Sequence, residues 1–248
     1  MGVSGRVAVV TGSGQGIGEG IARRLAAGGA RVVLNDVDEE RVAKAAAALA
    51  EQGADVAYFA GNVSVAEGAQ GLVDRAMEEF GQIDILVNNA GIARDKWLVR
   101  MSEEDWDQVI NVNLKSQFLC TKAAAAHMMD AGYGRIVNIA SRAWLGGAGQ
   151  ANYSASKGGV VSFTRTLALE FAKYQITANA VAPALVDTPL FRGLKEEVQQ
   201  RLISTIPVGR IGGVEEIAEA VAFFAADESW YITGQLLYVC GGRSIGAA

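Results

Sequence analysis

Seven short apolar runs recur along the chain, and a helical pattern separates each run from the next. Strand alternating with helix predicts a parallel sheet with helices on both faces and right-handed crossovers. A chain of 248 residues, half of them hydrophobic, is long enough for one such doubly wound α/β domain, which we expect over residues 1–248. The predicted strands are Arg6–Thr11, Arg31–Asp36, Asp55–Ala60, Asp84–Asn88, Arg135–Ala140, Ile176–Val181 and Gln235–Val239.

A glycine-rich turn, Gly12-Ser13-Gly14-Gln15-Gly16-Ile17-Gly18, joins the first predicted strand to a helical pattern over residues 19–27. Glycines allow a sharp turn and let a pyrophosphate approach the backbone, while the helix N-terminus offers free N–H groups and a positive dipole end. In a chain with 30 glycines, such a run is also compatible with a plain chain reversal. Because it lies between a strand and a helix, however, it predicts a dinucleotide-binding loop and a Rossmann-like fold.

The second predicted strand ends in the acidic residue Asp36. A carboxylate at this position accepts hydrogen bonds from the adenosine ribose hydroxyls and repels a 2′-phosphate. Neither Lys nor Arg occurs in the glycine turn or directly after Asp36, so the sequence favours NAD over NADP. Asp36 could instead cap the next helix, but Asp38, followed by Glu39-Glu40, is the better cap. We therefore expect Asp36 to be free for the ribose.

Tyr153 and Lys157 are four residues apart in a segment with a helical pattern, so their side chains share one helical face. A lysine ammonium beside a phenol favours the phenolate, which lets the tyrosine exchange protons below its free pKa of about 10. Ser141 follows an apolar strand and can place a hydroxyl at the same point. This trio would act on one reacting oxygen as acid/base, activator and hydrogen-bond donor. The Tyr–Lys pair alone is a weak indication, since such pairs also occur on solvated helix faces.

Taken together, these residues resemble the short-chain dehydrogenases/reductases. Thr11-Gly12-x-x-x-Gly16-x-Gly18 matches the cofactor motif of that family, and Asn88-Asn89-Ala90-Gly91 matches its NNAG motif. The resemblance extends from about residue 3 to residue 242. The residues that match the family's catalytic tetrad are Asn113, Ser141, Tyr153 and Lys157.

The resemblance implies roles for further residues. It places the adenine beside Asn62-Val63 and lines the cofactor channel with Asn88 and Ala90. It also implies that Lys157 binds the nicotinamide ribose and that Asn113 holds a water in a proton relay through Lys157. The expected cofactor contacts are Gly12, Ser13, Gln15, Gly16, Ile17, Gly18, Asp36, Val37, Asn62, Val63, Asn89, Ala90, Gly91, Tyr153, Lys157, Pro183, Ala184, Val186 and Thr188.

The sequence departs from the family pattern at two places. The family has Pro-Gly after the sixth strand, whereas this chain has Pro183-Ala184, which stiffens the backbone beside the nicotinamide. Near the C-terminus, the common Val-Asp-Gly-Gly is replaced by Val239-Cys240-Gly241-Gly242. Any contribution of that aspartate to subunit contacts is therefore absent.

Substrate contacts are expected after Ser141 and on a helical lid over about residues 188–207. Arg142 and Trp144 predict an apolar or aromatic slot with a cationic contact, suited to an acyl thioester or a carboxylate-bearing alcohol. The alternative is that Arg142 turns away into a salt bridge. The stretch 141–147 resembles that of family members acting on aromatic β-hydroxyacyl-CoA esters in the benzylsuccinate pathway. The expected substrate contacts are Arg142, Ala143, Trp144, Gln150, Leu185 and Arg192, the last for a CoA phosphate.

The sequence thus predicts an NAD-dependent oxidoreductase that interconverts a secondary alcohol and a ketone, with a β-hydroxyacyl-CoA as the favoured substrate. One alternative is an NADPH-dependent 3-oxoacyl carrier-protein reductase, against which Asp36 argues. Another is a non-catalytic dinucleotide-binding subunit, against which the intact tetrad argues.

Composition excludes several other classes. A net charge of −5 without a basic run argues against nucleic-acid binding, and no apolar stretch of about 18 residues predicts a membrane span. The chain enters its first strand at once, leaving no room for a signal peptide, so we expect a cytoplasmic protein. Cys120, Cys240 and the single histidine His127 are too few for a metal site, and we expect both thiols to be buried and reduced. The family resemblance implies a tetramer of identical or different subunits.

Overall fold

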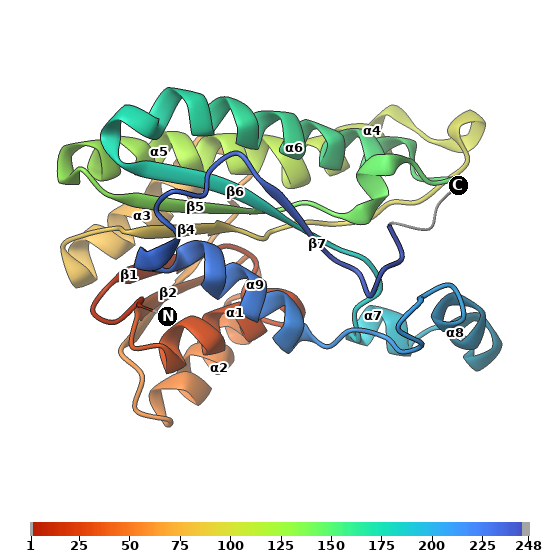
Figure 1. Cartoon of the computed structure of the whole chain (residues 1–248), viewed down its shortest axis with the longest axis horizontal. Coiled ribbons are helices and arrows are strands. Elements are labelled where there is room, and N and C mark those ends of the chain that lie inside the picture. Colours follow the sequence, from red (N-terminus) through yellow and green to blue (C-terminus); the bar gives the residue numbers. More distant parts are fainter. Residues whose placement is uncertain (1, 245–248) are drawn as a thin grey trace.

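The computed structural model describes residues 2–244, which form one parallel sheet with helices packed on both faces (Figure 1). The predicted fold class is therefore confirmed. The strand order is β3-β2-β1-β4-β5-β6-β7, and every neighbouring pair is parallel. The strands are β1 Val7–Val10, β2 Arg31–Asp36, β3 Val56–Ala60, β4 Ile85–Asn88, β5 Gly134–Ile139, β6 Ile176–Pro183 and β7 Leu236–Val239.

Helices α1, α2 and α9 cover one face of the sheet, and α3, α4, α5 and α6 lie on the other (Figure 1). The longer helices are α1 Gly16–Ala27, α2 Glu39–Ala50, α3 Ala66–Phe80, α4 Glu103–Ile110, α5 Ser116–Ala131, α6 Ala151–Phe171, α8 Glu196–Ile203 and α9 Val214–Ala225. The short helices are α7 Pro189–Arg192, the π-turn η2 Asn111–Lys115, and the 3₁₀ turns η1 Leu98–Arg100, η3 Arg142–Leu145, η4 Ala172–Tyr174 and η5 Asp227–Ser229.

The predicted strand bounds agree with the observed ones to within two residues, and only two element ends bear on function. Strand β6 continues to Pro183 because its pairing with β7 extends to Val239. Helix α1 begins at Gly16, three residues earlier than predicted, because the glycine turn leads into the helix without an intervening loop.

The core is arranged as two layers on either side of the sheet. Every residue of β1, β4, β5 and β6 is buried, as expected for parallel strands covered on both faces. Alternate residues of β1 pack oppositely: Val10 lies with α1, α2 and α9, and Val9 lies with α3 and α5. This buried sheet is a rigid platform, and the chain reverses its winding between β1 and β4, where ligands bind such folds.

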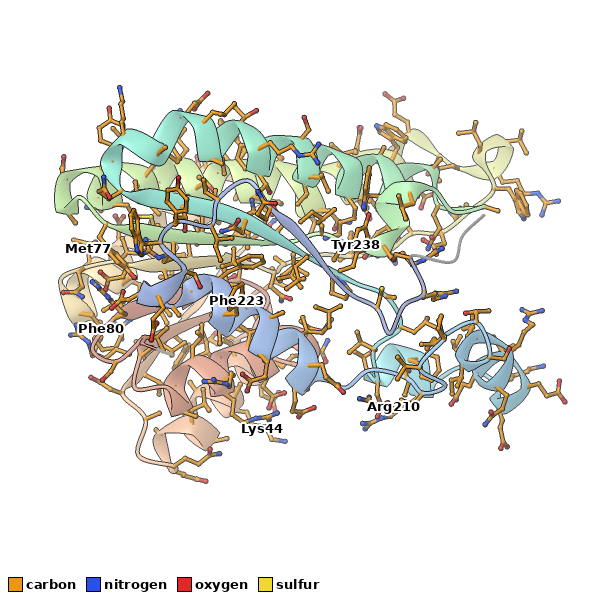
Figure 2. The ribbon with its side chains drawn as sticks, viewed as in Figure 1. Lys44, Met77, Phe80, Arg210, Phe223 and Tyr238 are labelled. Carbon is orange, nitrogen blue, oxygen red and sulfur yellow. The ribbon has the colours of Figure 1, made fainter. Side chains whose placement is uncertain are left out.

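Strand β6 leads into α7 and α8, which project beyond the carboxyl end of the sheet (Figure 1). Figure 2 shows Arg210 beside α7, on the connection that returns to α9. The base of this segment is anchored by the buried Phe191 and Ile206, whereas α8 has no buried residue. Closure of this segment as a lid stays a prediction. None of the described helices is long and apolar enough to cross a membrane.

Candidate active site

The glycine turn is clamped against the loop that follows β4. The Asn89 side-chain amide donates to the carbonyl oxygens of Thr11 and Gly12, each at 2.9 Å. The Thr11 hydroxyl accepts from the backbone N–H groups of Asn89 (2.9 Å) and Ala90 (3.0 Å). A Cβ at Gly18 would collide with the Gly12 carbonyl oxygen and with the Asn89 amide. Only glycine therefore fits at position 18, and the α1 N-terminus lies directly against the turn.

The residues of this turn fit a dinucleotide. Gln15, the residue before α1, makes no side-chain hydrogen bond to the helix, so no side chain blocks the first-turn N–H groups from an anion. Gly16 has a φ of 60° and open space where a Cβ would lie, which leaves the backbone exposed to a ligand. One predicted contact is wrong. The Ser13 hydroxyl is fully buried, donates to the Val10 carbonyl at 2.8 Å and accepts from the Asn35 N–H, so it holds the turn from beneath.

Asp36 lies beside the turn at the end of β2, as predicted, and its carboxylate also has partners within the protein. Its carboxylate accepts from the N–H of Gly14 (3.3 Å) and of Asp38 (3.2 Å), and Arg41 Nη1 lies 3.5 Å away. Asp38 caps α2 as predicted and also holds the Arg41 guanidinium at 2.9 Å. The sequence has no Lys or Arg in the glycine turn or directly after Asp36, but the first turn of α2 brings Arg41 back to it. A cavity of about 310 Å³ adjoins this group, lined by Gly14, Glu19, Arg41, Lys44, Ala45 and Ala48.

Three members of the predicted tetrad meet where β5 ends and α6 begins. The Ser141 hydroxyl lies close enough to Tyr153 to lower the pKa of the phenol. One turn further along α6, Lys157 Nζ lies 5.7 Å from the centre of the Tyr153 ring and donates to the Ile139 carbonyl at 2.8 Å. Lys157 is only 3 % exposed, so its ammonium lies beneath the tyrosine rather than in solvent. The predicted sharing of one helical face is confirmed.

Asn113, the fourth member, is fully buried in the π-turn η2. Its carboxamide oxygen accepts from the Ile92 N–H at 2.8 Å, and its amide donates to the Ile92 carbonyl (3.0 Å) and to Ser156 Oγ (3.2 Å). A Cβ at Gly91 would lie 3.3 Å from Asn113 Oδ1 and 3.7 Å from Lys157 Nζ. The side chain thus fixes the loop after the Asn88–Gly91 motif next to the lysine.

The protonation of the pair differs from the sequence expectation. Burial raises the pKa of Tyr153, and the nearby Ser141 hydroxyl offsets only part of that rise. Burial lowers the pKa of Lys157 to about 8. Burial of the phenol thus acts against the phenolate, and a further positive charge beside it would favour the phenolate.

The side chains of Asn88 and Asn89, at the start of the Asn88–Gly91 motif, point in opposite directions. Asn88 does not line a channel: its amide donates to Asn138 (2.8 Å) and Thr121 (3.2 Å) in the interior, and it is 1 % exposed. The Asn62 side chain accepts from the N–H and hydroxyl of Ser64, forming a local turn after β3. Val63 is buried and the Val37 side chain is 69 % exposed.

The loop after β6 accommodates Ala184 without strain. Its N–H donates to the Val239 carbonyl at 3.3 Å, and its φ is not positive, since Gln175 is the single non-glycine with positive φ in residues 2–244. Val186 then pairs in a β-bridge with Gly212 and is buried, which fixes the approach to Thr188. Leu185 lines a cavity of about 150 Å³ together with Cys240.

Several expected substrate contacts have partners within the protein. The Trp144 indole packs on the cluster between α6 and β6 and donates to the Tyr238 hydroxyl at 2.7 Å. Gln150 donates to Asp95 at 2.7 Å. Arg192 is exposed and contacts both carboxylate oxygens of Asp187, at 2.7 and 2.9 Å, and its contact with a CoA phosphate stays a prediction. Ala143 donates its backbone N–H to Ser141 Oγ at 3.1 Å.

Cys240 also differs from expectation, since its thiol is only partly buried while Cys120 is fully buried. Partial burial raises the pKa of the Cys240 thiol, but the neighbouring polar groups of Gly242, Arg243 and Ser244 outweigh it, and the net pKa is lowered. Cys240 occupies the position where the family has an aspartate. Among residues 2–244, no group of three or more His, Cys, Asp or Glu side chains is placed to hold a metal ion.

Comparisons with known proteins agree with this geometry. The family model described as "Enoyl-(Acyl carrier protein) reductase" matches residues 12–244. The (2S)-((R)-hydroxy(phenyl)methyl)succinyl-CoA dehydrogenase subunit BbsD of Thauera aromatica is 49% identical over 245 residues, covering 99% of both chains. The 3-oxoacyl-acyl-carrier-protein reductase FabG of Escherichia coli strain K12 is 42% identical over 243 residues, covering 98% of each chain. The crystal structure of levodione reductase matches with a TM-score of 0.94 at 33% identity, covering 98% of this chain and 99% of that one.

Proposed function

The chain belongs to the short-chain dehydrogenase/reductase family, and on that premise we propose that it oxidises a β-hydroxyacyl-CoA to the β-keto ester with NAD. The carrying observation is the juxtaposition of Ser141 and Tyr153 with the buried Lys157, whose Nζ lies 5.7 Å from the centre of the Tyr153 ring. Two hydroxyls converge there on the place of a single reacting oxygen.

In the oxidation direction, Tyr153 as the phenolate takes the proton of the substrate hydroxyl, and Ser141 donates a hydrogen bond to the same oxygen as it becomes a carbonyl. NAD, when bound, would supply the hydride acceptor and a positive charge that favours the Tyr153 phenolate. The carbinol carbon gives up its hydride, so each turnover yields one ketone, one NADH and one proton. The Ile139 carbonyl oxygen accepts a hydrogen bond from the Lys157 ammonium and fixes its position. Asn113 fixes the neighbouring loop by accepting from the Ile92 N–H.

Asp36 supports NAD as the cofactor. Its carboxylate lies against the Gly14 N–H, where it would accept from ribose hydroxyls and repel a 2′-phosphate. Arg41 is the cation nearest to it, but this guanidinium already contacts Asp36 and Asp38. A 2′-phosphate would have to displace one of these carboxylates to gain Arg41.

The CoA thioester is supported by the similarity to BbsD, whose name states a succinyl-CoA ester as its substrate. The stretch 141–147, which the sequence related to benzylsuccinate-pathway enzymes, lies at the reacting end of the site. Trp144 fixes this stretch to β7 through Tyr238, so the backbone around Ser141 is held rigidly.

A 3-oxoacyl carrier-protein reductase using NADPH is the second candidate. Two observations favour it: the 42% identity to FabG and the presence of Arg41 and Lys44 in the cavity beside Asp36. In that case the same Tyr153 and Ser141 would run the reaction in reverse.

The test is dinucleotide reduction with a matched set of substrates: 3-hydroxy-3-phenylpropionyl-CoA, its free acid, and 1-phenylethanol, each with NAD and with NADP. We expect turnover of the thioester with NAD, and at least about tenfold lower kcat/KM for the other combinations. A preference for NADP would favour the reductase, and equal activity on the plain alcohol would contradict the thioester assignment.

A further inference from the structure

Arg142, the residue after Ser141, and Arg243 near it have no counter-ion among residues 2–244. Arg142 begins η3 directly after Ser141, and its Nε donates to the Arg243 carbonyl oxygen at 3.3 Å. The two positive charges are close enough that Arg142, after burial, is the main cause of a lowered pKa of Arg243. Neither side chain lies within 4.0 Å of a carboxylate oxygen in residues 2–244.

Arg142 and Arg243 lack a carboxylate or aromatic partner among residues 2–244. In this they differ from the other partly or fully buried arginines of these residues, which all contact a carboxylate or an aromatic ring. The arginines with a carboxylate partner are Arg6, Arg23, Arg24, Arg41 and Arg75. The arginines placed over an aromatic ring are Arg31 and Arg135. Two like charges held together and partly withdrawn from water are unfavourable unless an anion joins them.

Arg142 and Arg243 both lie at the carboxyl end of the sheet, where the substrate is expected to bind. Arg142 follows β5 and Arg243 follows β7, and β6 lies between these two strands in the sheet. The arginines therefore meet beyond the carboxyl end of β6, on the side of the sheet end where Ser141 lies. Trp144 is hydrogen-bonded to Tyr238 of β7, which Figure 2 shows on the strand leading to the C-terminal turn, and this bond ties η3 to that turn.

We propose that Arg142 and Arg243 bind a carboxylate on the acyl part of the substrate, so that the enzyme prefers a β-hydroxyacyl thioester carrying a second acid group. This proposal rests on the proposed function and specifies its substrate class. A guanidinium pair matches a carboxylate well, because each planar fork can donate two hydrogen bonds to its oxygens. The carboxylate would also orient the hydroxyl-bearing carbon toward Tyr153.

Binding of inert substrate analogues tests the proposal without depending on turnover. Benzylsuccinyl-CoA and 3-phenylpropionyl-CoA differ only by a carboxymethyl group, and neither has a hydroxyl to oxidise. Their affinities are measured by calorimetry in the presence of NAD for the wild type, Arg142→Gln and Arg243→Gln. We expect the wild type to bind the carboxylate-bearing ester about 10- to 100-fold more tightly, and each Gln variant to lose most of that preference.

Further variants guard against misfolding and nonspecific charge effects. Arg165→Gln removes an exposed arginine on α6 and should keep the full preference. Arg243→Lys keeps the charge without the planar fork and should retain part of the preference. Thermal unfolding identifies any variant that is destabilised.

The phosphates of CoA are the other anions that could use the pair, and pantetheine thioesters of both acids separate the two sources. If the arginines bind the carboxylate, the preference persists on pantetheine esters; if they bind a phosphate, both Gln variants weaken both CoA esters equally, which overturns the proposal. A wild type without preference overturns it as well. A clear preference in an enzyme that fails to oxidise any hydroxyacyl thioester would instead contradict the proposed function and leave the carboxylate site standing.

Discussion

Replacing Lys157 by methionine should change the pH dependence of stability by a defined amount. The ammonium is 3 % exposed, and burial lowers the pKa of Lys157 from 10.5 to about 8. A pKa about 2.5 below that of the unfolded chain corresponds to about 3 kcal/mol of unfavourable free energy for the charged form. Below about pH 8 the lysine is protonated in the folded and the unfolded chain, so the wild type bears the whole of this cost.

As the pH rises from about 8 to about 10.5, the folded chain releases its proton while the unfolded chain keeps it, and the wild type becomes more stable. Lys157→Met has no such group. Its lost hydrogen bond to the Ile139 carbonyl lowers stability by an amount that does not depend on pH. The stability difference between wild type and variant should therefore shift by about 3 kcal/mol in favour of the wild type over this interval.

The assay is urea unfolding followed by tryptophan fluorescence, at several pH values between about 7 and 10.5. Lys122→Met, which removes an exposed lysine on α5, is the matched control and should give a difference that changes little with pH. If the difference between wild type and Lys157→Met stays constant to within about 1 kcal/mol, the charged lysine is not held in a desolvated site and the reasoning is refuted.

Three further substitutions test the cofactor side of the site. Gly18→Ala should weaken NADH binding at least about tenfold, measured by fluorescence titration, because a methyl group there collides with the turn; unchanged affinity would contradict that geometry. Asn113→Ala should reduce kcat about 10- to 100-fold and lower stability by about 1–3 kcal/mol, because the partly buried Ile92 N–H loses its acceptor; an unchanged kcat or an unchanged free energy of unfolding would contradict this role. Asp36→Asn should raise kcat/KM for NADP about tenfold or more, because Arg41 loses one of its two carboxylates, and an unchanged NADP to NAD ratio would show that Arg41 is irrelevant.

The fold could be predicted from the sequence because the patterns that indicate it involve residues close together along the chain. The alternation of apolar strands and helical patterns predicts a parallel sheet, and the spacing of Tyr153 and Lys157 predicts their shared face, whatever the rest of the chain does. The cap at Asp38 is equally local, since its side chain reaches an N–H three residues ahead.

Burial and side-chain direction were harder to predict. Asn88 and Asn89 are adjacent in one motif, yet Asn88 points into the interior and Asn89 reaches the glycine turn, because neighbouring residues at a strand end face opposite ways. Ser13 lies in the turn but bonds the strands beneath it. A motif identifies the segment that approaches the cofactor, but not which of its side chains do.

The contacts that the sequence missed join distant segments. Arg41 reaches Asp36 only after α2 has turned, although its position three residues after Asp38 on a helix was a usable indication. Arg243 meets Arg142 only because β5, β6 and β7 are neighbours in the sheet. The rule that site residues follow strand ends also applies to β7, and applying it there would have included Arg243.

The central claim is that Tyr153 carries the proton transfer, and Tyr153→Phe tests it most directly. NADH formation from a β-hydroxyacyl-CoA and NADH binding by fluorescence are measured on the same preparations of wild type and variant. We expect kcat to fall about 10²- to 10⁴-fold, because the substitution removes the hydroxyl that exchanges the proton. The Kd for NADH should stay within about threefold, because the substitution removes only one oxygen atom. Turnover within about tenfold of the wild type would contradict the account, since the proton would then leave by another route.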